Sequence, residues 1–131
     1  MIVLLPTTLC LTAAALVVNF WLSMRIGKLR HAHGVSVGDG GNEAILRRMR
    51  AQLNFIEQVP LTLLAIALVE AAGKGGAWLA PVGAVFILGR VAHAIGMDGG
   101  FKAGRGIGML TGMVIQLGLV VVSVLIALNK F

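Results

Sequence analysis

Long runs of apolar residues alternate with short polar segments along the whole chain. Four runs are long enough to cross a bilayer, which takes about 20 apolar residues. They cover approximately residues 2–24, 49–72, 77–97 and 107–128. Because these residues form runs instead of the amphipathic stripes of a soluble helical domain, the pattern predicts an all-α integral membrane protein.

The connections between the runs are short and polar. The longest is segment 33–42, and two glycine-rich turns at 72–76 and 98–104 join the remaining runs. Four helices joined by such connections form an antiparallel bundle. We therefore expect residues 1–131 to form one domain, an antiparallel four-helix membrane bundle.

Composition and charge also predict how the chain is oriented in the membrane. Of 131 residues, 58% are hydrophobic and 12% charged, and the net charge is +6. The segment from Arg25 to Arg50 holds six Lys or Arg residues, whereas the turn at 72–76 holds one. Because cytoplasmic loops are rich in Lys and Arg, we expect both termini outside, on the periplasmic side of a bacterial inner membrane. The positive charge favours contact with anionic membrane lipids. Nucleic-acid binding is not expected, because no aromatic residues are interleaved with the basic residues.

A ladder of polar residues enters the second apolar run. Arg50, Asn54 and Glu57 are spaced i, i+4 and i+7, so at about 100° per residue they fall within about 60° of arc on one helix face. Unpaired charges in hydrocarbon are costly, and those that occur usually serve a function or pair between helices. The ladder is therefore predicted to face a polar partner or a ligand.

The third apolar run carries a second polar face, formed by Arg90 and His93. At 1.5 Å per residue, Glu57 and Arg90 lie at similar depth, each roughly 10 Å from the cytoplasmic end. We expect an ion pair between them. These two residues would either form a structural bridge that holds the bundle together or contact a ligand, and both roles stay open. His93 alone is more typical of a core histidine. No metal site is expected, since the histidines at 31 and 33 lack further ligands nearby.

Three glycines, Gly104, Gly108 and Gly112, are spaced by four at the start of the last run. This small-residue spacing lets membrane helices approach closely. A phosphate-binding loop is the alternative, but no strand precedes these glycines. Arg105 lies inside the cluster, where bare backbone would leave its guanidinium free to reach a ligand.

Two motifs resemble a known family. Arg-Ala-Gln-x-Asn-x-x-Glu-x-x-Pro-Leu at 50–61 resembles the signature of the MAPEG proteins (membrane-associated proteins in eicosanoid and glutathione metabolism), and is especially similar to the leukotriene synthases. Arg-Val-Ala-His at 90–93 resembles the third-helix segment of the microsomal prostaglandin E synthases. The resemblance implies a homotrimer that binds glutathione between subunits near the cytoplasmic face. The candidate binding residues are Arg30, Arg50, Asn54, Glu57, Arg90 and His93, and Arg105 matches the fourth-helix arginine that faces the thiol.

The resemblance also implies a chemistry. Arg30 and Arg50 would hold the glutathione carboxylates in charge-assisted pairs, and Arg105 would lower the pKa of the thiol, as neighbouring cations do. The thiolate would then attack a lipophilic small molecule dissolved in the membrane. The expected function is that of a glutathione transferase or peroxidase.

One departure from the family pattern keeps alternatives open. The family's third-helix tyrosine is Met97 here, and the chain contains no tyrosine. A non-catalytic scaffold that binds glutathione or lipid is therefore one alternative. A small multidrug-type transporter is another, although such exporters depend on an acidic residue in the first helix and the run 2–24 has none.

Overall fold

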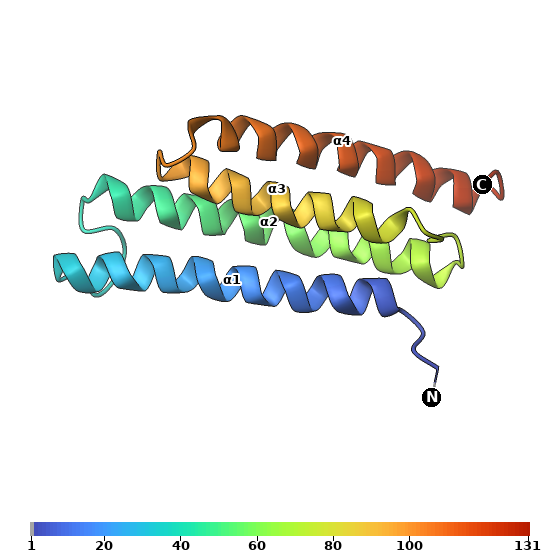
Figure 1. Ribbon diagram of the computed structural model, residues 1–131, viewed down its shortest axis with the longest axis horizontal. Helices are drawn as coiled ribbons and strands as arrows, with labels where there is room; N and C mark the ends of the chain where they lie inside the picture. Colours follow the sequence, from blue (N-terminus) through green and yellow to red (C-terminus); the bar gives the residue numbers. More distant parts are fainter. Residues whose placement is uncertain (1) are drawn as a thin grey trace.

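The computed structural model describes residues 2–131, and its regular structure consists of four α-helices. They are α1 (Pro6–His33), α2 (Glu43–Ala71), α3 (Leu79–Met97) and α4 (Lys102–Ala127). Each is long and apolar enough to cross a membrane, and consecutive helices run in opposite directions (Figure 1). The prediction of an all-α integral membrane fold is confirmed.

The first two helices extend beyond the apolar runs that predicted them. α1 continues past residue 24 to His33, and the next residue, Gly34, adopts the left-handed conformation (φ 65°) that closes many helices. α2 begins well before residue 49, at Glu43, and the side chain of the preceding Asn42 accepts a hydrogen bond from the N–H of Ile45. Local capping residues therefore set these helix ends, whereas hydrophobicity marks only the part of each helix that suits a bilayer.

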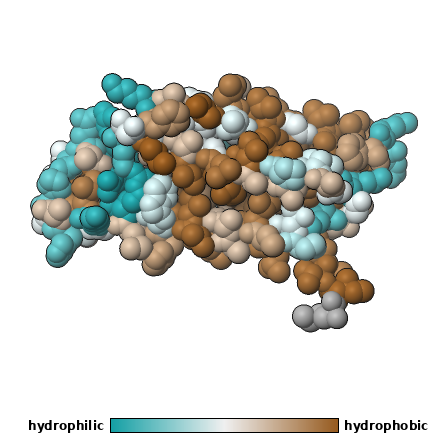
Figure 2. Space-filling model, in the orientation of Figure 1, coloured by the Kyte–Doolittle hydropathy of each residue, from teal (hydrophilic) through white to brown (hydrophobic). Residues whose placement is uncertain are grey.

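The four helices form an open arrangement. α2 and α3 lie between α1 and α4 (Figure 1), and α1 makes no contact with α4 within residues 2–131. Apolar side chains gather in the middle of the visible face, with polar side chains towards both ends (Figure 2). Only 11% of the most apolar stretch of α4 is buried. The outer faces of α1 and α4 must therefore meet lipid or another chain.

Polar contacts fasten α1 at each end of the bundle. At the end with the α1–α2 and α3–α4 connections, here called the basic end, Asp98 accepts hydrogen bonds from Arg25 of α1 and Arg48 of α2. At the opposite end, here called the terminal end, Glu70 of α2 accepts hydrogen bonds from the backbone N–H groups of Thr7 and Thr8. α1 is thereby fixed along the length of α2.

α3 and α4 pack through glycines, and we call this contact the α3–α4 seam. An added Cβ at Gly96 would lie 2.3 Å from the backbone nitrogen of Arg105. A Cβ at Gly108 would lie 2.4 Å from the carbonyl oxygen of Gly89, so neither position has room for a side chain. The seam comprises Gly89 and Gly96 of α3 with Gly104, Gly108 and Gly112 of α4. The close packing predicted from the glycine spacing is confirmed.

Candidate functional site

A cavity of about 390 Å³ lies between α2, α3 and α4 near the basic end. We call it the polar pocket. Five of the seven candidate residues line it: Arg50, Asn54, Glu57, His93 and Arg105. Leu53, Met97 and Met109 complete its lining. The helical spacing of the ladder on α2 thus places all three of its members in one cavity.

Arg105 reaches the polar pocket because α4 starts close to the end of α3. It lies in the first turn of α4, three residues after Lys102. Gly96 has no side chain, so the backbone of Arg105 packs directly against α3. The α3–α4 seam therefore fixes the position of the Arg105 backbone, from which the side chain extends into the pocket.

Arg90 lies beside the polar pocket and not in its lining. It is 3% exposed, and its Nη1 donates a hydrogen bond to Oδ1 of Asn54 at 2.6 Å. Its Nη2 donates to the carbonyl oxygen of Gly108. A Cβ at Gly112 would lie 2.6 Å from this Nη2, so the absence of a side chain there makes room for the guanidinium. Arg90 thus links the α3–α4 seam to Asn54.

The prediction of an ion pair between Glu57 and Arg90 is wrong. Within residues 2–131 Glu57 forms no ion pair, and it is exposed in the single chain. The two residues were expected to meet because they lie at similar depth. Depth does not fix the direction of a side chain around the helix axis, and Arg90 turns towards Asn54 and α4 instead.

Arg30 lies apart from the other candidates. It lines a cavity of about 490 Å³ on the α1–α2 face, which it shares with Arg50. Its Nε donates a hydrogen bond to the carbonyl oxygen of Gly38 at 2.9 Å. A single chain therefore does not bring Arg30 into the polar pocket.

The polar pocket has an excess of positive charge. Its lining holds two arginines, Arg50 and Arg105, and one carboxylate, that of Glu57, and the buried Arg90 is hydrogen-bonded to Asn54 of the same lining. In the single chain these three lining side chains are exposed, and only Arg90 is buried. Guanidinium groups bind carboxylates through paired hydrogen bonds, so the pocket suits an anionic ligand that also carries a cationic group.

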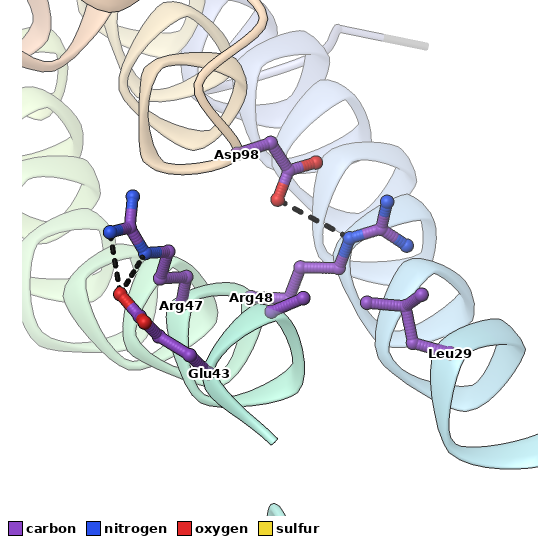
Figure 3. Close-up of a pocket in the computed structure, with 6 residues that line it drawn as sticks. Leu29, Glu43, Arg47, Arg48 and Asp98 are labelled. Atoms are coloured by element: carbon purple, nitrogen blue, oxygen red, sulfur yellow. Dashed lines mark hydrogen bonds and ion pairs between the residues drawn. The ribbon is translucent and has the colours of Figure 1, made fainter. Parts of the chain in front are cut away.

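A second cavity at the basic end has no such excess. It has a volume of about 400 Å³, and Figure 3 shows its side chains. Arg47 pairs with Glu43 at 2.6 Å, and Arg48 contacts Asp98 at 3.3 Å. The lining of this cavity contains as many carboxylates as arginines, so the polar pocket is the better site for an anion.

One polar cluster was missed by the reasoning from sequence. Gln116 of α4 donates from Nε2 to Oε1 of Gln58 at 2.8 Å and to Oγ1 of Thr62 at 3.0 Å. The available signal was an amide in the middle of the fourth apolar run, which needs a partner from another helix. The cluster lines two cavities between α2 and α4 that adjoin the polar pocket, and we call the two together the α2–α4 groove.

Comparison with known protein families confirms the resemblance seen in the sequence. The sequence profile of the MAPEG family matches residues 8–125, a range that includes every residue of the polar pocket. No curated protein and no solved structure matches the chain. At the level of the family, this match indicates a membrane protein whose function is related to glutathione. The chain belongs to the MAPEG family.

Proposed function

We propose that the polar pocket binds glutathione and that the chain is a glutathione transferase or peroxidase acting on membrane-soluble electrophiles. The observation that carries the proposal is the charge of the pocket, in a chain that belongs to the MAPEG family. Glutathione has two carboxylates, one ammonium group and one thiol. Two arginines, one glutamate and a buried neighbouring arginine complement these groups.

Each side chain has a role in this proposal. Arg50 pairs with a carboxylate of glutathione in a charge-assisted contact, and Glu57 accepts hydrogen bonds from its ammonium group. Asn54 contacts the peptide backbone of the ligand, and its orientation is fixed by the hydrogen bond from Arg90. His93 completes the binding surface on α3.

Arg105 acts on the sulfur atom. A guanidinium beside a thiol favours its ionised form, and the apolar side chains of Met97 and Met109 line the same pocket. In the transferase reaction, the thiol gives its proton to water, and the thiolate then forms a bond to a carbon of the electrophile while the bond from that carbon to its leaving group breaks and the leaving group takes the electron pair. No nucleophile from the protein is required.

The proposal includes assembly as a homotrimer. Arg30 lies on the α1–α2 face of its own chain, so it could complete the polar pocket of a neighbouring chain but not of its own. The exposed outer faces of α1 and α4 leave apolar surface for such an assembly. In this proposal the pocket lies near the cytoplasmic face of a bacterial inner membrane, with both termini in the periplasm.

The test is to titrate the thiolate absorbance of bound glutathione against pH in the wild-type protein and in Arg105→Ala. We expect the bound thiol of the wild type to ionise at lower pH than free glutathione, and the difference to vanish in the variant. Lys102→Ala is the matched control, because Lys102 lies one turn earlier on α4 and does not line the pocket. Arg105→Ala should also lower kcat far more than it lowers glutathione affinity, since the contact between Arg105 and the sulfur atom strengthens in the transition state.

A non-catalytic glutathione-binding scaffold is the second candidate. Met97 lines the polar pocket at the position where the family tyrosine is expected, and methionine offers no hydroxyl group to a ligand. If glutathione binds but its thiol ionises at the pH of free glutathione in both proteins, the scaffold is the better description.

A further inference from the structure

The turn between α3 and α4, residues 98–101, precedes the helix that carries Arg105, and the local sequence stabilises it poorly. Asp98 follows the last residue of α3, where the negative end of the helix dipole disfavours a carboxylate. Within residues 2–131, Phe101 forms no side-chain hydrogen bond that would cap α4. Lys102 and Arg105 place positive charge in the first turn of α4, which the dipole also disfavours. Both helix ends should therefore fray unless another contact holds them.

Asp98 supplies that contact. Its carboxylate accepts hydrogen bonds from Arg25 of α1 and from Nε of Arg48 of α2, the second at 3.3 Å (Figure 3). The exposed fractions of the three side chains are 24% for Asp98, 12% for Arg25 and 22% for Arg48. Solvent ions screen such partly buried pairs less than they screen pairs on an open surface. We call these three residues the Asp98 cluster.

Both arginines of the Asp98 cluster are themselves held in place. The guanidinium of Arg25 lies over the ring of Trp21, 4.5 Å from its centroid, and the face of an aromatic ring attracts a cation. Nη1 of Arg48 donates a hydrogen bond to the backbone carbonyl of Arg25 at 2.7 Å. The carboxylate of Asp98 therefore bonds to two groups whose positions are fixed by α1 and α2, and the end of α3 is attached to both helices.

Only a short stretch of chain separates Asp98 from Arg105. Gly96, two residues before Asp98, packs against the backbone of Arg105, where an added Cβ would lie 2.3 Å from the nitrogen atom. The turn after Asp98 contains Gly99 and Gly100, and Gly99 has a positive φ of 82°. These glycines have no side chains that could hold the turn. Release of Asp98 would therefore free the first turn of α4 to move, and Arg105 with it.

We propose that Asp98 is a positioning residue for the thiolate chemistry. Its bonds to Arg25 and Arg48 hold the turn 98–101, and the turn holds Arg105 where the proposed function places the sulfur of glutathione. Asp98 does not line the polar pocket but the neighbouring cavity of about 400 Å³, so it acts through Arg105 and not on the ligand. This inference rests on the proposed function for the role of Arg105.

A direct electrostatic effect of Asp98 on the thiol would have the opposite sign. Removal of a nearby negative charge favours the thiolate, so it would lower the pKa of the bound thiol. Displacement of Arg105 takes a cation away from the sulfur and raises that pKa. The sign of the change in Asp98→Asn therefore separates positioning from an effect through space.

The experiment makes two measurements on the full-length protein in phospholipid nanodiscs. The first is the thiolate absorbance of bound glutathione against pH, and the second is hydrogen exchange of the backbone amides of residues 99–105 without glutathione. In Asp98→Asn the bound thiol should ionise at higher pH than in the wild type. The amides should exchange about tenfold faster, the ratio given by the loss of one charge-assisted hydrogen bond. Unchanged exchange of residues 119–127, at the other end of α4, shows that the variant has folded.

Arg48→Met is the second variant. It releases the same carboxylate but removes a charge of the opposite sign, so positioning predicts that both measurements change in the same direction as in Asp98→Asn. The double variant should change little beyond the larger single effect, because the two residues share one contact. Glu43→Gln is the control. Glu43 lines the same cavity as Asp98 but bonds to Arg47 of its own helix (Figure 3), so both measurements should keep their wild-type values.

Three results would overturn the inference: a bound thiol that ionises at an unchanged or lower pH in Asp98→Asn, a thiol shift in Arg48→Met that is absent or opposite, or unchanged amide exchange of residues 99–105 in Asp98→Asn. A wild-type thiol that ionises at the pH of free glutathione would instead show that the proposed function fails. The exchange measurement uses no glutathione, so faster exchange in Asp98→Asn would still support the hold of Asp98 on the turn, and unchanged exchange would overturn it.

Discussion

The two contacts of α4 differ in what they leave unsatisfied. In the α3–α4 seam, glycines bring the two backbones together, and a buried guanidinium bonds to the carbonyl of Gly108. In the α2–α4 groove, the same helix meets α2 through the amides of Gln58 and Gln116, and within residues 2–131 one hydrogen-bonding group of each amide has no partner. The seam holds side chains in place, whereas the groove leaves polar groups without a partner inside the described chain.

The seam also influences the polar pocket without lining it. Arg90 takes its position from Gly108 and Gly112, and it then holds Asn54 by a hydrogen bond of 2.6 Å. A change in the seam should therefore be felt at the ligand. Variants of α4 and of Arg90 can separate packing from binding.

The largest effect is expected from Gly108→Ala. Its Cβ would lie 2.4 Å from the carbonyl oxygen of Gly89 and 2.6 Å from Cβ of His93, and such overpacking costs about 1–3 kcal/mol. Thermal unfolding in detergent should show this loss. Gly118→Ala is the control on the same helix, because nothing lies within 4 Å of its added Cβ, and it should be neutral or slightly stabilising. Equal stability of the two variants would mean that α3 and α4 are not closely packed.

A smaller effect, on binding, is expected from Arg90→Met. Without the guanidinium, Asn54 loses its fixed orientation, and glutathione affinity should fall about tenfold, or about 1.4 kcal/mol. Stability should change less than in Gly108→Ala, because the buried charge of Arg90 pairs with no carboxylate within residues 2–131. Isothermal titration with glutathione checks the affinity, with Arg47→Met as the control at an exposed arginine. Full affinity in Arg90→Met would show that α2 alone orients Asn54.

The smallest effect on stability is expected from Gln116→Met. Hydrogen bonds between membrane helices contribute on average about 0.6 kcal/mol, and this variant removes the two that join α4 to Gln58 and Thr62. The unfolding temperature in detergent should stay close to that of the wild type. A loss as large as that of Gly108→Ala would mean that the α2–α4 groove is a packing contact, which contradicts the comparison.

The sequence predicted the features that depend on the spacing within one helix. The ladder of Arg50, Asn54 and Glu57 shares one cavity because the period of the helix alone places its members on one face. The spacing of the glycines in α4 predicted the α3–α4 seam for the same reason, because the period of the helix places them on one face. Whether these pocket residues bind glutathione stays a prediction.

Features that depend on how one helix is turned towards another were not predictable in the same way. Spacing gave Glu57 and Arg90 the same depth, but the rotation of α3 directs Arg90 to Asn54 and Gly108. The pairing of Gln58 with Gln116 depends on the distance between α2 and α4, which neither helix encodes alone. Both cases require the packing of two helices to be known.

The contact of Glu70 with the start of α1 has a consequence for biosynthesis. The first turn of α1 has no capping side chain of its own, and the N–H groups of Thr7 and Thr8 are satisfied by a carboxylate 62 or more residues later in the chain. Until α2 emerges from the ribosome, these backbone donors of a newly made α1 have only water as a partner. We expect the two helices to enter the membrane together as a hairpin, with Glu70 arriving last to complete it.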